Sequence, residues 1–219
     1  MKNYEKEMIN VIRALDESQA LKHVVITGSW ALYFYSNIFN GFVPRTETTD
    51  LDLYLPNPKK AIGENLSTKM RQYTYKKNND YLTGKTTFLS EDGFSVEFLV
   101  VPDRTMSNTI KIEGLDVVAE ALPKTAPLGW NSISVCFENW MINIVSPVSF
   151  VLQKLLINKE RKPEYKKIKD IDAVIYVLGF IKASKKYQEE LVASFETYPK
   201  KWKKTILETA KENRINLFK

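Results

Sequence analysis

The chain has 219 residues, of which 44% are hydrophobic and 12% aromatic, enough to bury a substantial core in one large domain or two small ones. Cys136 is the only cysteine, which excludes an intramolecular disulfide and the cysteine clusters of structural zinc sites. His23 is the only histidine, so a histidine-dependent catalytic triad would have to rest on it, and we interpret it as a structural or surface residue. The N-terminus is charged and no apolar run is long enough to cross a bilayer, so we expect a cytoplasmic protein that makes no membrane contact.

The net charge of +6 is concentrated in the C-terminal third of the chain. Basic residues cluster between residues 154 and 169 and again between residues 200 and 204, where Trp202 interrupts the lysines. Such clusters attract phosphate-bearing partners such as RNA, although they are also typical of a solvated helix face, which we favour on charge alone.

Helical and strand patterns alternate in the N-terminal half. Apolar residues at helical spacing predict a first helix around residues 8–15, and the β-branched run 23–27 predicts a short buried strand. Gly28 and Ser29 interrupt that strand, and residues 30–35 form an apolar helical segment. Exposed backbone amides at such a turn favour an anion, which makes Gly28 and Ser29 candidates for phosphate binding.

Further elements follow a long connection that contains Arg45. Residues 48–55 predict a strand and residues 59–75 a helix. Two more strands are expected at residues 81–90 and 94–101, because Asp-Gly between β-rich runs is a hairpin signal. We predict one more hairpin, over residues 132–145.

The pattern becomes helical near residue 146. Ser146 and Pro147 form a good helix start, with a hydroxyl capping residue and a proline in the first turn. Two apolar stripes follow: Val148, Val151, Leu152, Leu155 and Leu156, then Ile168, Ile171, Val174, Ile175 and Leu178. We therefore place a domain boundary between residues 1–145 and 146–219.

Asp50 and Asp52 are the most informative residues of the sequence. Side chains alternate along a strand, so these two carboxylates share a face while Leu51 and Leu53 share the buried one. Two like charges side by side repel each other, and a divalent metal would give them a reason to be there. A surface-exposed edge strand and salt bridges to the many lysines are the structural alternatives.

Glu97 lies among apolar neighbours on a strand that we expect to be central. A buried, unpaired carboxylate costs several kcal/mol. If this strand lies beside the aspartate strand, Glu97 can meet Asp50 and Asp52 across the sheet, and three carboxylates can hold two metal ions. An ion pair with a helix lysine is the alternative.

Gly28-Ser29 after a strand, then Asp50-x-Asp52, then Glu97 on a later strand, resembles the DNA polymerase β-type nucleotidyltransferase superfamily. The surrounding sequence is most similar to bacterial nucleotidyltransferase-like proteins, which include abortive-infection toxins of toxin–antitoxin systems. The resemblance implies an α+β fold, in which a mixed-sheet catalytic domain (1–145) precedes a C-terminal helical domain (146–219). The sequence departs from the superfamily pattern in two respects. The connection between Ser29 and Asp50 is longer than in the compact members, and the third carboxylate is Glu97 where many members have Asp.

The resemblance implies transfer of a nucleoside monophosphate from an NTP to an acceptor hydroxyl, with release of pyrophosphate. Asp50, Asp52 and Glu97 would be catalytic and hold two Mg²⁺ ions, with Mn²⁺ as a substitute, and Glu97 could act as general base. The nucleotide would bind to Gly28, Ser29, Arg45, Lys154 and Lys169, the last three with less support.

The acceptor and two other functional classes stay open at this stage. RNA such as tRNA, a protein hydroxyl and a small molecule are all acceptable acceptors, and the sequence does not reveal the preferred NTP or the oligomeric state. The first rival function is a non-catalytic nucleotide- or RNA-binding module that retains the fold. The second is a sugar-nucleotide glycosyltransferase, in which an Asp-x-Asp pair also holds a metal, although such an enzyme needs neither the Gly-Ser turn nor Glu97.

Overall fold

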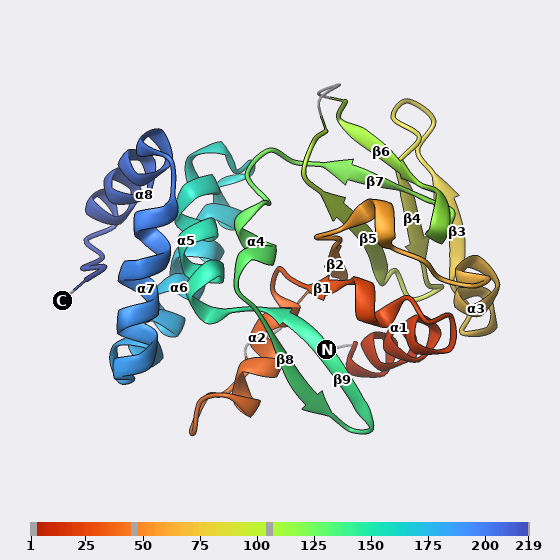
Figure 1. Ribbon diagram of the computed structural model, residues 1–219, viewed down its shortest axis with the longest axis horizontal. Coiled ribbons are helices and arrows are strands. Elements are labelled where there is room, and N and C mark those ends of the chain that lie inside the picture. Colours follow the sequence, from red (N-terminus) through yellow and green to blue (C-terminus); the bar gives the residue numbers. More distant parts are fainter. Residues whose placement is uncertain (1–3, 45–47, 104–106, 219) are drawn as a thin grey trace. The chain divides into compact units, whose positions relative to one another are not determined.

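The fold is α+β and consists of two compact units, Met1–Val145 and Ser146–Lys219 (Figure 1). The computed structural model describes residues 4–44, 48–103 and 107–218. The division between the units falls where the sequence pattern changes from mixed to helical.

A mixed sheet forms the first unit. Within the described residues it has nine strands: β1 (Val25–Ile26), β2 (Asp50–Tyr54), β3 (Lys76–Asn79), β4 (Thr86–Leu89), β5 (Ser95–Val100), β6 (Thr109–Ile112), β7 (Val117–Ala121), β8 (Ser132–Phe137) and β9 (Trp140–Val145). The main path runs β3-β4-β5-β2-β1-β9-β8, and β7 pairs with both β5 and β6. The pairs β1–β9, β2–β5 and β5–β7 are parallel, and the others are antiparallel.

Strand β5 is central, as predicted, because it pairs with β2 on one side and with β4 and β7 on the other. The hairpins β4–β5 and β8–β9 form where the sequence predicts them. Along β2 and β5, the alternate residues Leu51, Leu53, Val96 and Phe98 are buried. Their burial fixes which face of the sheet the intervening polar residues occupy.

The described helices of the first unit are α1 (Glu5–Glu17), α2 (Trp30–Phe34), α3 (Leu66–Gln72) and α4 (Pro127–Trp130). They include the two short apolar segments α2 and α4, of which only α2 was predicted. The predicted helix 59–75 is wrong in its first half, since helix α3 begins at Leu66. Gly63 is the reason: its N–H donates to the carbonyl of Gly114 at 2.7 Å, and a Cβ there would lie 2.7 Å from Leu115. That close approach holds the segment in a non-helical path.

Two strand predictions also need correction. The strand expected at residues 23–27 is only the two residues of β1, preceded by a 3-10 turn at Leu21–His23. Residues 81–85 form a turn rather than the start of a strand, and β4 pairs with the polar strand β3, which the sequence did not indicate. A lysine- and asparagine-rich edge strand has no hydrophobic signal, and such residues are typical of protected sheet edges.

The second unit consists of the helices α5 (Pro147–Ile157), α6 (Glu164–Lys182), α7 (Lys185–Thr197) and α8 (Lys200–Glu212). The predicted helix start is confirmed: the Ser146 hydroxyl accepts a hydrogen bond from the Ser149 N–H at 3.1 Å, with Pro147 in the first turn. The predicted stripe of α5 is buried throughout. None of the described helices combines the length and the apolar character needed to cross a membrane.

The predicted stripe of α6 is only partly right. Ile171, Val174 and Leu178 are buried, but Ile168 and Ile175 are 57% and 52% exposed. These two isoleucines are seven residues apart and share one side of the helix, beside the arc that contacts α5 and α7. Val177 and Ile181 complete the buried arc instead.

Candidate active site

The first unit brings the predicted carboxylates onto one face of the sheet. Parallel pairing of β2 with β5 places Asp52 opposite Glu97 and Asp50 opposite Ser95. Leu51, between the two aspartates, and Leu53, after the second one, are fully buried. The carboxylates therefore project from the opposite face of the sheet. The condition that the sequence left open, that the Glu97 strand lies beside the aspartate strand, is therefore met.

The Gly28 turn lies directly against Asp52. Gly28 has a φ of +63°, and a Cβ added to it would lie 2.5 Å from Oδ2 of Asp52. The preceding residue is tied to the same strand, because the Thr27 N–H donates to the Asp52 carbonyl at 3.0 Å. Ser29 follows at the N-cap position of α2, but its side chain makes no capping hydrogen bond.

The side chain of Asp50 is oriented by Thr48, which lies two residues earlier, just before β2. The hydroxyl of Thr48, which is buried, donates to Oδ1 of Asp50. The Asp50 residue itself is exposed, whereas Asp52 is intermediate in exposure. The Gly28 turn, the two aspartates and Glu97 are thus linked to one another through strand β2.

Sequence reasoning missed Lys85, which is the direct partner of Glu97. Its Nζ lies 2.8 Å from Oε2 of Glu97 and 2.9 Å from Oε2 of Glu120, a residue of β7. The expected alternative for Glu97 was a helix lysine, but Lys85 stands just before β4. Thr87, two residues on, pairs with Glu97 in the β4–β5 ladder, so hairpin register brings Lys85 here.

The donor set fits Mg²⁺ in its chemistry. Asp50, Asp52 and Glu97 offer hard oxygen ligands, and Mg²⁺ in proteins usually takes one or two carboxylates and completes its shell with water and phosphate. Within the described ranges, no group of three or more His, Cys, Asp or Glu residues is gathered closely enough to hold a metal ion. The two aspartates offer oxygen ligands of the right chemistry for the ion, while Glu97 is engaged by Lys85.

Tyr54, on the same face of β2 as the aspartates, is a packing residue. It is 3% exposed, and burial raises the pKa of its hydroxyl to about 12. Gly129 of α4 covers its ring so closely that a Cβ there would lie 2.7 Å from Cε1 of Tyr54. The ring of Tyr54 is thus packed against α4 and has a structural role.

The remaining predicted nucleotide ligands lie outside the described part of the first unit. Arg45 lies outside the described residues. Lys154 is buried in the second unit, where its Nζ lies 2.6 Å from Oδ1 of Asp170, and Arg161 binds the other carboxylate oxygen at 2.9 Å. Lys169 is an exposed residue of α6. Nucleotide binding by these three residues stays a prediction.

Many lysines of the basic clusters pair with acidic residues of the same unit. The pairs are Lys159 with Glu208 and Glu212, Lys167 with Glu164, Lys203 with Glu196, and Lys204 with Glu208. Such pairing is what a solvated helix face predicts, and it reduces the charge available to a nucleic acid.

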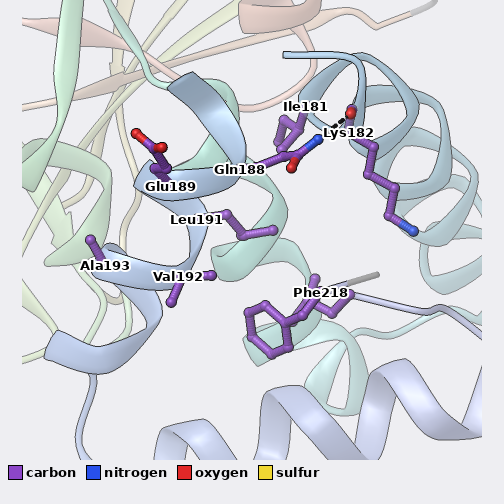
Figure 2. Close-up of a pocket in the computed structure, with 9 residues that line it drawn as sticks. Ile181, Lys182, Gln188, Glu189, Leu191, Val192, Ala193 and Phe218 are labelled. Carbon is purple, nitrogen blue, oxygen red and sulfur yellow. Dashed lines mark hydrogen bonds between the residues drawn. The ribbon is translucent and has the colours of Figure 1, made fainter. Parts of the chain in front are cut away.

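A pocket of about 600 Å³ opens in the second unit (Figure 2). Figure 2 shows Leu191, Val192 and Phe218 around it, with Gln188 donating to the carbonyl of Lys182. None of the predicted site residues that the structure describes lines this pocket. The candidate active site is therefore the polar sheet face of the first unit.

Comparisons with known proteins identify the family and support the fold. A family model described as nucleotidyltransferase matches residues 6–193. The solution structure of the antibiotic-resistance factor ANT(2'')-Ia is similar, with a TM-score of 0.52 and 14% identity over 95% of this chain and 96% of its own. The crystal structure of ANT(2'')-Ia in complex with adenylyl-2''-tobramycin has a TM-score of 0.51 and 14% identity, over 89% of this chain and 98% of its own. No curated protein sequence matches the chain.

Proposed function

Because this chain belongs to the nucleotidyltransferase family, we propose that it transfers a nucleoside monophosphate from an NTP to an acceptor hydroxyl in a Mg²⁺-dependent reaction. The observation that carries the proposal is the register that puts Asp52 opposite Glu97, with Asp50 on the same face. A binding-only protein has little physical reason to keep Asp50 and Asp52 on one face, since like charges repel, whereas the charge of Glu97 is balanced by Lys85.

Each residue of the site has a proposed task. Asp50 and Asp52 would hold Mg²⁺, with Glu97 as third ligand and acceptor of the hydroxyl proton. When bound, the metal would neutralise charge on the triphosphate and favour attack by the acceptor oxygen. The backbone at Gly28 and the hydroxyl of Ser29 would receive the terminal phosphates, because Gly28 lies directly beside Asp52.

A small hydroxyl-bearing molecule is the acceptor class that we propose to test first. The ANT(2'')-Ia complex holds an adenylylated aminoglycoside, adenylyl-2''-tobramycin. The ion pairing of the basic helices gives RNA less support than charge alone suggests. RNA, a protein hydroxyl and the toxin-like role remain separate arms of the same assay.

The test incubates the protein with each α-labelled NTP and Mg²⁺ in the presence of aminoglycosides, total RNA or cell lysate. We expect label on one acceptor class together with pyrophosphate release, and loss of both with EDTA. The double variant Asp50→Asn/Asp52→Asn should lose at least about a hundredfold in rate, since it removes the ligands of the metal. Glu91→Gln, an exposed acid of the β4–β5 turn, is the matched control and should be unchanged.

Two outcomes would count against the proposal. Equal transfer by the double aspartate variant and the wild type would exclude a role for the carboxylates. Nucleotide binding that EDTA does not affect, without pyrophosphate release for any NTP and acceptor, would favour the non-catalytic binding module. Circular dichroism of each variant shows whether a lost activity reflects a lost fold.

A further inference from the structure

Lys85 joins three neighbouring strands at the edge of the candidate site. It stands just before β4, and its ammonium lies between Glu97 of β5 and Glu120 of β7, at 2.8 and 2.9 Å. The three side chains are 22%, 26% and 35% exposed, so the cluster is partly shielded from water. One cation here serves two carboxylates.

Two charge-assisted hydrogen bonds hold this cluster together. The ammonium of Lys85 donates to Oε2 of Glu97 at 2.8 Å and to Oε2 of Glu120 at 2.9 Å. The carboxylate oxygen of Glu97 is therefore occupied by a cation of the protein itself.

The same carboxylate is the third one of the candidate metal site. Register places Glu97 beside Asp52, yet the described residues contain no cluster of three acids close enough to share an ion. A metal that takes Glu97 as a ligand must compete with the ammonium of Lys85, since both bind the charged carboxylate.

We propose that Lys85 is a built-in competitor of the divalent cation for Glu97. It neutralises Glu97 in the metal-free protein and passes to Glu120 alone when Glu97 joins Asp50 and Asp52. This inference rests on the metal site of the proposed function, but not on the acceptor or on the transfer itself.

Because of Glu120, the proposal predicts opposite changes in metal affinity for two substitutions. Glu120 accepts a hydrogen bond from the same ammonium as Glu97, and it would keep Lys85 as its partner after Glu97 is released. Removing Lys85 should therefore strengthen metal binding, whereas removing the charge of Glu120 should commit Lys85 more fully to Glu97 and weaken metal binding.

The experiment titrates the full-length, metal-free protein with Mn²⁺ alone and follows unbound Mn²⁺ by electron paramagnetic resonance. Lys85→Met should lower the Kd for Mn²⁺ by about threefold to fivefold, the upper part of the range for a partly exposed ion pair. Glu120→Gln should raise that Kd, and Lys85→Arg should resemble the wild type because it keeps the cation. Lys77→Met is the matched control, since Lys77 pairs with Asp116 at 2.7 Å on the same sheet.

A double-mutant cycle separates competition for Glu97 from a general change of charge. In a Glu97→Gln background, Lys85→Met should change the Kd for Mn²⁺ by less than about twofold, because the contested ligand is gone. An equal effect of Lys85→Met in both backgrounds would overturn the proposal, as would unchanged or undetectable Mn²⁺ binding by Lys85→Met itself. Circular dichroism confirms that each variant is folded.

The proposal and the proposed function can fail separately. Transfer that depends on Asp50 and Asp52, together with Mn²⁺ binding that Lys85→Met leaves unchanged, would refute only the role of Lys85. A positive Mn²⁺ cycle without transfer to any acceptor would refute only the enzymatic function.

Discussion

The backbone of Gly28 and the carboxylate of Asp52 occupy adjoining space, so that a Cβ atom on Gly28 would lie 2.5 Å from Oδ2 of Asp52. Gly28 also has a φ of +63°, a region that residues with a side chain adopt at a cost. The turn and the acid thus constrain each other. A phosphate held by the turn would lie next to a metal held by the acid, which is the arrangement that nucleotidyl transfer needs.

Substitution of Gly28 by alanine should damage both the fold and the site. The positive φ alone costs about 1–2 kcal/mol, and displacement of the Asp52 carboxylate adds to it. We expect the free energy of unfolding to fall by about 2–4 kcal/mol and the transfer rate to fall more than about tenfold. Chemical denaturation and the labelled-NTP assay measure the two effects.

Gly41→Ala is the matched control for this substitution. Gly41 has a φ of +75°, but a Cβ there would meet nothing within 4 Å. It should lose only the cost of the backbone conformation and leave transfer intact. An equal loss in the free energy of unfolding for Gly28→Ala and Gly41→Ala would show that contact with Asp52 does not contribute to the destabilisation.

The carboxylate face could be predicted because its determinants are local. Alternation of Asp50 and Asp52 with Leu51 and Leu53 fixes the face within one strand, and the apolar neighbours of Glu97 mark a central strand. Glu97 meets the two aspartates only because β2 pairs with β5 in parallel, which the sequence raised only as a condition. The start of α5 was equally local, since Ser146 and its neighbours carry the whole signal.

The parts that escaped prediction depend on distant partners. Lys85 reaches Glu97 only through the register of β4 on β5, and Glu120 joins them from β7, a strand without a clear pattern. Gly63 interrupts a plausible helix because Leu115 and Gly114 pack against it. The sequence near such residues does not reveal the distant partner that determines their conformation.

The buried ion pair of the second unit should be a stability element. Lys154 and Asp170 have side chains only 6% and 8% exposed. Lys154→Met leaves Asp170 with Arg161 alone, and breaking a buried pair by removing one partner costs about 3–5 kcal/mol in general. Because Arg161 stays, we expect a loss of about 2–3 kcal/mol in the free energy of unfolding.

Lys159→Met is the control for that measurement. Lys159 also pairs with two acids, Glu208 and Glu212, but its side chain is 37% exposed, so its loss should cost less than about 1 kcal/mol. The same variants address the predicted nucleotide contact of Lys154. A raised KM for NTP with Lys154→Met, at unchanged stability, would favour nucleotide binding over the structural role.

Glu190 of α7 should make stability depend on pH in a defined direction. Burial raises the pKa of its carboxyl above the ordinary value of 4.5, although a hydrogen bond from the Ser146 hydroxyl and the charge of Lys186 oppose this. A raised pKa in the folded state means that folding favours the protonated form. The contribution to stability is therefore full below the unfolded pKa and is lost as the pH rises through the folded value.

Glu190→Gln should consequently stabilise the protein at neutral pH, by about 0.5 kcal/mol after allowance for solvent screening of a half-exposed group. The gain should disappear as the pH falls below the ordinary glutamate pKa, because the wild-type carboxyl is then protonated as well. Denaturant unfolding at pH 7 and pH 4 measures both values. Glu189→Gln removes the same charge at an exposed neighbouring position and should show no such pH-dependent gain. A gain for Glu190→Gln that is equal at both pH values would mean that the effect comes from helix propensity rather than from burial of the charge.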